Sequence, residues 1–204
     1  LTKVLATMPV CQLYLPEIEC DDVIAWLCKG KFVSYEGMKT VVSSDKDFYQ
    51  LLEDPNVNIY DPGRKILIDQ EYVKKNFEIC PRNIALARCM AGDVSDNIDG
   101  VPGIGLKTVS KRFKEFLDDT IDLNVNWVIE RSKTLLETTK KPPKCYQDIL
   151  DNEELLRRNW RLMYLDTGCL APAQISRLEF RIEDFVTKMN RIDYIKEFIA
   201  ADVT

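Results

Sequence analysis

The sequence predicts an α/β fold, with a mostly parallel sheet and flanking helices, followed by a helical subdomain. Three observations predict it. Two β-rich segments, residues 10–15 and 40–43, are each followed by an acidic cluster and a helical pattern. Such alternation of strands and helices is typical of α/β folds. A glycine-rich segment at residues 100–105 follows, and beyond it the patterns indicate helices.

The expected elements of the first fifty residues are a weak helix at 1–8, a strand at 10–15, a helix at 22–27, a strand at 40–43 and a short helix at 48–52. Asp21 or Asp22 suits the first turn of its helix, where a carboxylate complements the helix dipole. The strand at 40–43 is rich in β-branched residues, so we expect it to be buried on both faces.

A hairpin is expected next, with residues 57–60 and 65–68 as its strands. Pro62 and Gly63 suit the two central positions of a type II turn between them. Asp69 is a plausible cap for a helix over residues 70–77. Pro81 suits the first turn of a further helix that runs to about Ala91.

Helices are expected in the second half of the chain at residues 107–116, 125–138, 152–164 and 181–200. Residues 140–144, with three lysines and two prolines, predict a stiff basic loop. The last helix carries an apolar stripe that we expect to pack in the core. The stripe consists of Phe185, Met189, Ile192, Ile195 and Ile199.

Seven carboxylates gather in three short clusters, and these are the candidate metal ligands. They are Glu19, Asp21 and Asp22, then Asp45 and Asp47, then Asp93 and Asp96. Like charges this close repel one another unless a cation lies among them. The first two clusters follow strands, and ligands of open α/β sheets gather beyond the carboxyl ends of strands. The sequence therefore predicts a shared divalent-metal site. An EF-hand is excluded, because Ile98 and Gln50 stand where its loop requires glycine.

Composition excludes several kinds of chemistry. The chain has no histidine, which removes Ser-His-Asp triads, Cys-His proteases and His-ligated zinc sites. Its seven cysteines form no C-x-x-C pair and are expected to be reduced and mostly buried. No apolar run is long enough to predict a membrane span. The net charge of -5 argues against a protein that coats polyanions along its whole surface.

The segment from Gly100 to Lys107 predicts a helix-hairpin-helix turn. Glycines allow close backbone approach, and the free N–H groups of the next helix form a concavity for an anion. Lys107 and Thr108 stand at the start of that helix, and Lys111, Arg112 and Lys114 follow without an acidic residue. A P-loop is excluded by the spacing. The alternatives are a tight interhelical turn without a ligand and a solvated basic helix face.

Together these residues resemble the 5′-nuclease family, the flap endonucleases and 5′–3′ exonucleases, and most of all its bacteriophage members and the 5′-nuclease domains of bacterial DNA polymerases. Three ordered motifs carry the resemblance, between about Val10 and Phe116. They are Glu19-Cys20-Asp21-Asp22-Val23-Ile24, Ser44-Asp45-Lys46-Asp47-Phe48-Tyr49-Gln50-Leu51-Leu52, and Met90 to Asn97 continuing through Gly105. A weaker likeness to phage members continues at residues 152–159.

The resemblance implies a structure-specific nuclease that hydrolyses DNA at 5′ flaps or ends, and also RNA of RNA–DNA hybrids, with two Mg²⁺ ions that Mn²⁺ can replace. Glu19, Asp21 and Asp22 would belong to the first metal site, and Asp45, Asp47, Asp93 and Asp96 to the second. The helix-hairpin-helix would hold duplex DNA, often around K⁺. Its DNA-binding residues would be Gly100, Gly103, Ile104, Gly105, Lys107, Thr108 and Lys111. A monomer is expected, located in the cytoplasm, or in the host cytoplasm for a phage protein.

The family begins with acidic strands and a helical arch upstream of the first motif, but only 18 residues precede Glu19 here. We therefore expect a C-terminal fragment of a longer polypeptide, because a sheet without its first strand exposes an edge. Residues 1–98 would complete the α/β catalytic domain, and 99–204 would form the helix-hairpin-helix subdomain and C-terminal helices. The alternatives are a non-catalytic DNA-binding fragment and a metal-dependent ribonuclease or phosphatase on a related frame.

Overall fold

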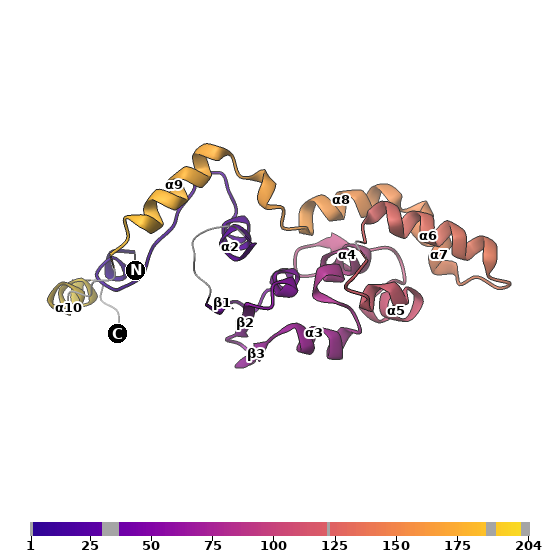
Figure 1. The fold of residues 1–204 in the computed structure, drawn as a ribbon, viewed down its shortest axis with the longest axis horizontal. Helices are drawn as coiled ribbons and strands as arrows, with labels where there is room; N and C mark the ends of the chain where they lie inside the picture. Colours follow the sequence, from indigo (N-terminus) through magenta and orange to yellow (C-terminus); the bar gives the residue numbers. More distant parts are fainter. Residues whose placement is uncertain (1, 30–36, 122, 187–190, 201–204) are drawn as a thin grey trace. The chain divides into compact units, whose positions relative to one another are not determined.

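The computed structural model describes residues 2–29, 37–121, 123–186 and 191–200. The chain forms two compact units (Figure 1). The larger unit is Val23–Thr167, and the smaller one combines Leu1–Asp22 with Gly168–Thr204. Helix α2 (Cys20–Lys29) begins in the last residues of the segment Leu1–Asp22, with Asp21 and Asp22 in its first turn as predicted. None of the helices formed by the described residues is both long and apolar enough to span a membrane.

The sheet of the larger unit has three strands in the order β1-β2-β3, which are Lys39–Val42, Val57–Asp61 and Ile66–Ile68. Strands β1 and β2 are parallel, with Val41 opposite Ile59, whereas β2 and β3 are antiparallel. The expectation of a mostly parallel sheet is therefore wrong for the described residues. Strand β1 was also expected to be buried on both faces, but it lies at a sheet edge and only Val41 is buried.

The hairpin of β2 and β3 is confirmed, but its turn is not type II. Gly63 lacks the positive φ that a type II turn requires at that position, and Lys65 has φ 54° instead. The Asp61 carboxylate organises the loop by accepting hydrogen bonds from the Arg64 backbone N–H and guanidinium, at 3.0 and 2.6 Å. A side-chain clamp therefore replaces the glycine conformation that the sequence predicted.

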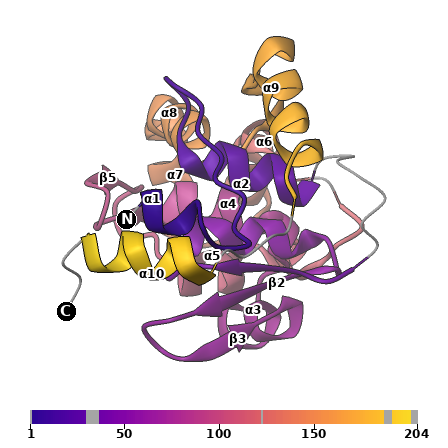
Figure 2. The same ribbon diagram turned by 90° about the vertical axis from the view of Figure 1, so that its left-hand side faces the viewer.

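The helices that follow the sheet match the sequence well. Helix α3 (Gln70–Phe77) is capped by Asp69, whose carboxylate accepts from the Tyr72 N–H at 2.8 Å. Helix α4 (Pro81–Ala91) is the centre of the unit, and almost all of its residues are buried. It packs against the 3₁₀ helix η1 (Lys46–Glu53) and against α8 (Glu153–Met163). Figure 2 shows α3 beside strand β3.

After α4 a short hairpin, β4 (Gly92–Asp93) and β5 (Ile98–Asp99), leads to the glycine segment and α5 (Leu106–Arg112). The helix expected over 107–116 divides at Phe113, whose φ of −124° and ψ of 85° end α5 before η2 (Lys114–Leu117). Phe113 is only 1% exposed and packs among Phe116, Trp127 and Tyr146. Burying this ring takes precedence over continuing the helix.

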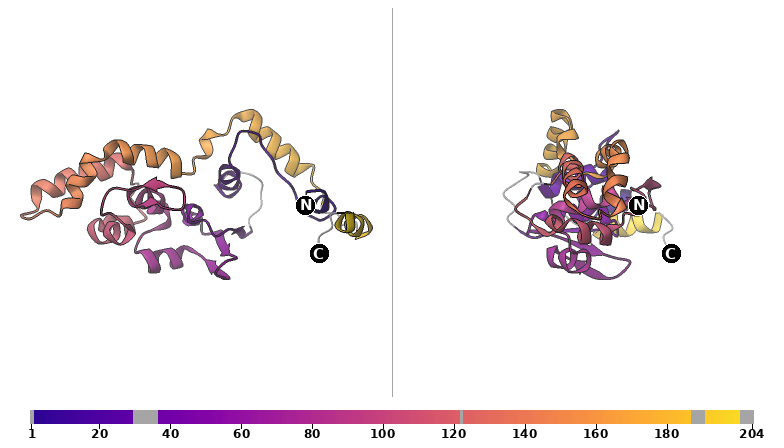
Figure 3. Two further views of the ribbon diagram at one scale, coloured as in Figure 1. Left: turned by 180° about the vertical axis from the view of Figure 1, so that it is seen from behind. Right: turned by 90° about the vertical axis from the view of Figure 1, so that its right-hand side faces the viewer.

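Helices α6 (Val125–Thr138), α7 (Lys144–Asp151) and α8 (Glu153–Met163) complete the larger unit (Figure 3, left view, salmon to orange). The bounds of α6 match the prediction, whereas α7 was missed because it starts inside the basic segment, directly after Pro143. The core of the unit is one hydrophobic cluster that extends from Ala25 to Leu165. The predicted domain boundary at residue 98 is not tested by this arrangement and stays a prediction.

The smaller unit contains α1 (Thr2–Leu5), α9 (Pro172–Glu183) and α10 (Arg191–Ala200), while η3 (Thr167–Cys169) lies at the boundary. The strand expected at 10–15 is absent, and the Gln12 side chain instead donates to the Thr2 carbonyl at 3.1 Å. The single helix expected at 181–200 is wrong in its start, since α9 already ends at Glu183. Met189 lies outside the described residues, Phe185 is half-buried, and Ile192, Ile195 and Ile199 are exposed, so the described isoleucines of the stripe do not pack in a core.

Candidate functional site

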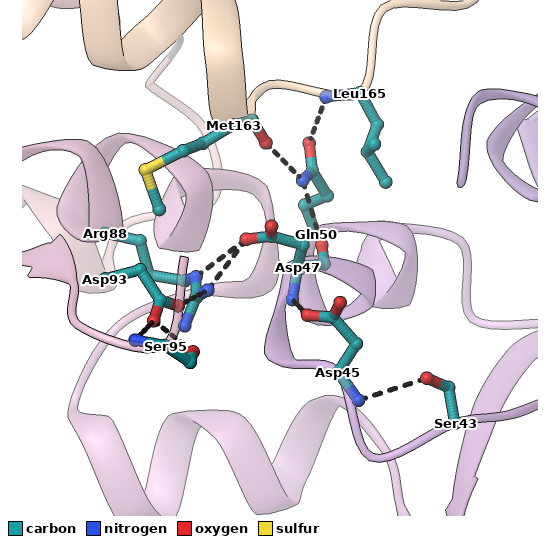
Figure 4. Close-up of polar contacts among 9 residues, drawn as sticks. All are labelled: Ser43, Asp45, Asp47, Gln50, Arg88, Asp93, Ser95, Met163 and Leu165. Carbon is teal, nitrogen blue, oxygen red and sulfur yellow. Dashed lines mark hydrogen bonds and ion pairs between the residues drawn. The ribbon is translucent and has the colours of Figure 1, made fainter. Parts of the chain in front are cut away.

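The second acidic motif turns into η1 directly after the edge strand β1. The Asp45 carboxylate caps η1 by accepting from the Asp47 backbone N–H at 2.8 Å, and the Asp45 N–H donates to the Ser43 hydroxyl at 3.0 Å. Asp45 is exposed at the start of the helix, while the side chain of Asp47 is only 16% exposed. The motif therefore directs Asp47 inward, toward α4 (Figure 4).

The third acidic motif meets the second one through a buried arginine. Arg88 Nε donates to Asp47 Oδ1 at 2.9 Å, and one terminal nitrogen of the same guanidinium lies 2.8 Å from Asp47 Oδ1 and 2.5 Å from Asp93 Oδ2. The Arg88 side chain is 7% exposed. Since both carboxylate oxygens lie within 2.8 Å of one nitrogen, they are less than twice that distance apart. Figure 4 shows the guanidinium between the two carboxylates.

The two carboxylates differ in their electrostatics. Burial raises the pKa of Asp47, and the Arg88 charge opposes that shift. The hydroxyl of Ser95 donates to Asp93 Oδ1, and this bond, with the Ser95 backbone N–H at 2.8 Å, lowers the pKa of Asp93. Burial also raises the pKa of the neighbouring Cys89 thiol to about 12, so this thiol is neutral and unreactive at ordinary pH.

The other predicted ligands are placed less closely. Asp96 is exposed at the tip of the β4–β5 hairpin, where Asn97 adopts φ 57°. Glu19 precedes α2, and Asp21 and Asp22 occupy its first turn, and all three belong to the smaller unit. The structure therefore brings together the side chains of Asp47 and Asp93 from two separate motifs, while the Asp45 carboxylate bonds to the Asp47 backbone N–H.

The chemistry of these side chains fits a hard divalent cation. Carboxylate oxygens are the ligands that Mg²⁺ and Mn²⁺ prefer, and a cationic nitrogen already lies between two of them. Across residues 2–29, 37–121, 123–186 and 191–200, no three acidic or cysteine side chains converge closely enough to hold one ion. Asp47 and Asp93 are thus two carboxylates held together by Arg88.

The glycine segment is anchored by two buried side chains and exposes its backbone between them. Val101 and Ile104 are 2% and 5% exposed, and the Val101 N–H donates to the Met90 carbonyl at 2.9 Å. Gly103 has φ +74°, which favours glycine, and a side chain at Gly103 or Gly105 would meet nothing within 4 Å. This stretch therefore presents open, accessible main chain.

At two other positions, Gly92 and Gly100, glycine is required because there is no room for a side chain. A Cβ at Gly100 would lie 2.2 Å from the Ala91 carbonyl oxygen, and one at Gly92 would lie 2.3 Å from the Gly100 nitrogen. This close backbone contact is where the end of α4 passes the end of β5. It sets the position of the glycine segment relative to Asp93.

Helix α5 begins at Leu106, as the sequence predicted to within one residue, and Gly105 is its N-cap. No side chain caps its first turn. Lys107 and Lys111 are exposed and lie four residues apart, which places them on the same face, and Thr108 is half-buried beside them. The exposed glycines and these lysines form a basic, open surface, whereas Ile104 is buried and its N–H donates to the Val101 carbonyl at 3.0 Å.

Sequence reasoning missed three buried polar residues that position this site: Arg88, Gln50 and Asn159. The Gln50 side chain donates to the carbonyls of Asp47 and Met163 and accepts from the Leu165 N–H, at 2.8, 3.0 and 3.0 Å (Figure 4). Asn159 on α8 donates to the Cys89 and Asp99 carbonyls at 3.0 and 2.8 Å. The sequence offers no clear signal for them, because Arg88 shares α4 with Arg82 and Asn83, and Asn159 lies among the charged residues of α8.

Comparison with known proteins gives the same family as the motifs. Residues 1–78 match the family model of the 5′-3′ exonuclease, N-terminal resolvase-like domain. The chain is 34% identical over 161 residues to a 5′-3′ exonuclease of Aquifex aeolicus, covering 74% of this chain and 54% of that protein. It is 32% identical over 149 residues to DNA polymerase I of Rhizobium leguminosarum, covering 73% of this chain and 13% of the polymerase.

Solved structures of a phage enzyme share the fold. A T5 5′-exonuclease with bound zinc ions superposes with a TM-score of 0.66 at 24% identity, covering 85% of this chain and 62% of that one. A bacteriophage T5 flap endonuclease in a product-like complex with DNA and metal ions gives 0.65 at 22% identity, with coverage of 85% and 61%. The predicted likeness to the 5′-nucleases is therefore confirmed. The chain spans between 13% and 54% of the first curated relatives that it matches.

Proposed function

We propose, from the premise that this chain is related to the 5′–3′ exonucleases and flap endonucleases, that it is the part of a structure-specific 5′-nuclease that holds divalent metal and grips duplex DNA. The observation that carries the proposal is the meeting of Asp47 and Asp93, from two motifs 46 residues apart in the chain, around one buried cation. The substrate would be DNA with a 5′ flap or end, and RNA of an RNA–DNA hybrid.

The acidic residues would hold the metal ions. Asp47 and Asp93 face the same point, and Asp45 adjoins Asp47 through the η1 cap. Asp96 would join from the exposed hairpin tip, and the first motif would supply the other site of a two-ion centre. When bound, Mg²⁺ or Mn²⁺ would supply Lewis acidity and neutralise charge on the phosphate. The chain has no histidine, so the other positioning groups would be carboxylates, lysines or a tyrosine.

The glycine segment and α5 would hold the duplex. A Cβ at Gly103 or Gly105 would meet nothing within 4 Å, so a phosphate could approach the main chain there and bond to N–H groups other than that of Ile104, which donates to the Val101 carbonyl. Lys107 and Lys111 add positive charge on one face, and Thr108 adds a hydroxyl. Such contacts fix the DNA backbone without reading sequence. Main-chain carbonyls of the segment would be the place for a K⁺ ion. Residues 99–204 would then act as the helix-hairpin-helix part of a monomeric enzyme.

Geometry connects the two parts. The close backbone contact of Gly92 and Gly100 joins the strand that carries Asp93 to the segment that would grip phosphate. A duplex held on α5 therefore lies at a fixed distance from the carboxylates. Positioning of this kind is a major source of rate in phosphoryl chemistry, because the reacting groups need not find each other by diffusion.

The test is cleavage of a 5′-labelled flap duplex by the 204-residue chain, with Mg²⁺ compared with EDTA, and with DNA binding measured in parallel. We expect Mg²⁺-dependent products near the junction, and slower cutting of a blunt duplex without a flap. Binding without cutting would support the alternative of a non-catalytic DNA-binding fragment. Preferential turnover of a small phosphate ester would support the phosphatase alternative. If the chain neither binds nor cleaves the DNA, the proposal is refuted.

A further inference from the structure

Arg88 places a permanent positive charge where two acidic motifs meet. A guanidinium remains protonated throughout the accessible pH range. Arg88 is held in the buried helix α4, with its side chain 7% exposed, so the charge cannot be solvated elsewhere without rearrangement. Its partners are Asp47 and Asp93, and it uses two of its nitrogens to reach them.

The contacts of Arg88 use the oxygen atoms that a metal ion would need. Asp93 has both of its oxygens engaged, Oδ2 with Arg88 and Oδ1 with the backbone N–H and hydroxyl of Ser95. Asp47 Oδ1 accepts from Arg88 Nε at 2.9 Å and lies 2.8 Å from a terminal nitrogen of the same guanidinium. A divalent ion that approaches these oxygens therefore competes with the hydrogen bonds of Arg88, and it is also repelled by the guanidinium charge at short range.

From this arrangement we infer that Arg88 is the resident cation of the site: it holds Asp47 and Asp93 together without metal, and a divalent ion enters by taking its place. This inference rests on the proposed metal-dependent nuclease and adds a positioning residue to it. Without any cation the two half-buried carboxylates would repel each other and destabilise the contact between η1 and α4. Arg88 thus preserves the geometry of the site and sets the concentration of metal at which the site fills.

The exchange predicts a gain of metal affinity when the charge is removed. In Arg88→Met the stem of the side chain keeps its volume in α4, while the competing cation is lost. We expect the dissociation constant for Mn²⁺, counted by the EPR signal of the free ion, to fall at least tenfold at low salt, which corresponds to about 1.4 kcal/mol. Without metal this variant should melt at a lower temperature than the parent chain, and saturating Mn²⁺ should close the gap.

Two matched variants separate this effect from a general loss of charge. Arg131→Met removes an arginine of α6 that pairs with Glu115 in another part of the unit, and should leave Mn²⁺ affinity unchanged. Arg88→Lys retains the charge and should bind Mn²⁺ within about threefold of the parent chain. If Arg88→Met binds Mn²⁺ no more tightly than the parent, Arg88 is only a structural ion pair and the inference is wrong.

A second measurement covers the case in which Arg88→Met does not fold. The Nε–H NMR signal of Arg88 in the parent chain, identified by its absence from Arg88→Lys, should move when Mg²⁺ is added, because Nε now donates to Asp47. A signal that stays in place at saturating Mg²⁺ would overturn the exchange. Failure of the parent chain to cleave flap DNA while Arg88→Met gains affinity would refute the proposed nuclease function and leave the inference standing.

Discussion

Asn159 on α8 holds the end of α4 and the β4–β5 hairpin, which carries Asp93, to the rest of the larger unit. Its substitution should therefore weaken this connection. Its side chain is fully buried and donates to two carbonyls, those of Cys89 and Asp99. Cys89 lies in the last turn of α4, where backbone carbonyls have no partner within the helix, and Asp99 lies in β5, which pairs with the strand of Asp93. Asn159→Ala leaves both acceptors without this donor.

The cost follows from those two carbonyls. A buried acceptor left without a partner costs about 1–3 kcal/mol, so we expect Asn159→Ala to lower the free energy of unfolding by about 2–4 kcal/mol. With a urea m-value of about 2 kcal/mol/M, the midpoint should shift by about 1–2 M. The assay is urea unfolding followed by circular dichroism, with the exposed Asn126→Ala of α6 as the matched control, expected within about 0.5 kcal/mol of the parent. A loss for Asn159→Ala no larger than that of the control would show that α8 does not clamp the end of α4.

Two further predictions concern DNA binding and acid stability. Lys107→Ala should weaken binding of flap duplex and reduce the slope of log affinity against log salt by about 1. The exposed Lys133→Ala is the control and should leave both unchanged. An unchanged slope for Lys107→Ala would mean that α5 does not contact phosphate. The pKa of Asp61 is lowered to about 2, first by the backbone N–H of Arg64, so its ionised form stabilises the fold above the unfolded pKa near 3.8, and that contribution is lost as pH falls toward 2. In Asp61→Asn, melting temperature should therefore vary less between pH 4 and pH 2 than in the parent chain, and an identical pH profile would contradict the role of this carboxylate in the hairpin turn.

Local signals predicted much of the fold. The Asp69 cap, the Pro81 start of α4 and the periodicity of α6 depend on residues close together in the sequence, and the structure has all three. Elements that depend on distant partners were predicted poorly. The segment at 10–15 has strand-like composition but pairs with no strand in the described residues, and α5 ends at Phe113 because that ring packs among aromatic residues from other helices.

The candidate site divides in the same way. The acidic motifs could be identified from the sequence alone, because carboxylates in tight clusters need a cation. The cation that the structure provides is Arg88, which looks in the sequence like an ordinary helix residue. Gln50 was likewise quoted only as part of a motif, whereas its side chain ties Asp47 to the end of α8. Such partners are set by packing between segments far apart in the chain, which local spacing does not encode.

The most direct test of metal-dependent cleavage by this site is to measure rate and affinity together for Asp93→Asn. Single-turnover cleavage of flap DNA in Mg²⁺ and the dissociation constant of the same DNA are compared for the parent chain, Asp93→Asn and the exposed control Asp151→Asn of α7. We expect Asp93→Asn to lose about 100-fold or more in rate, about 2.7 kcal/mol, with DNA affinity within about twofold and the control unchanged. Cleavage by Asp93→Asn at the parent rate, or an equal loss of rate and affinity, would contradict the assignment of Asp93 to the metal site.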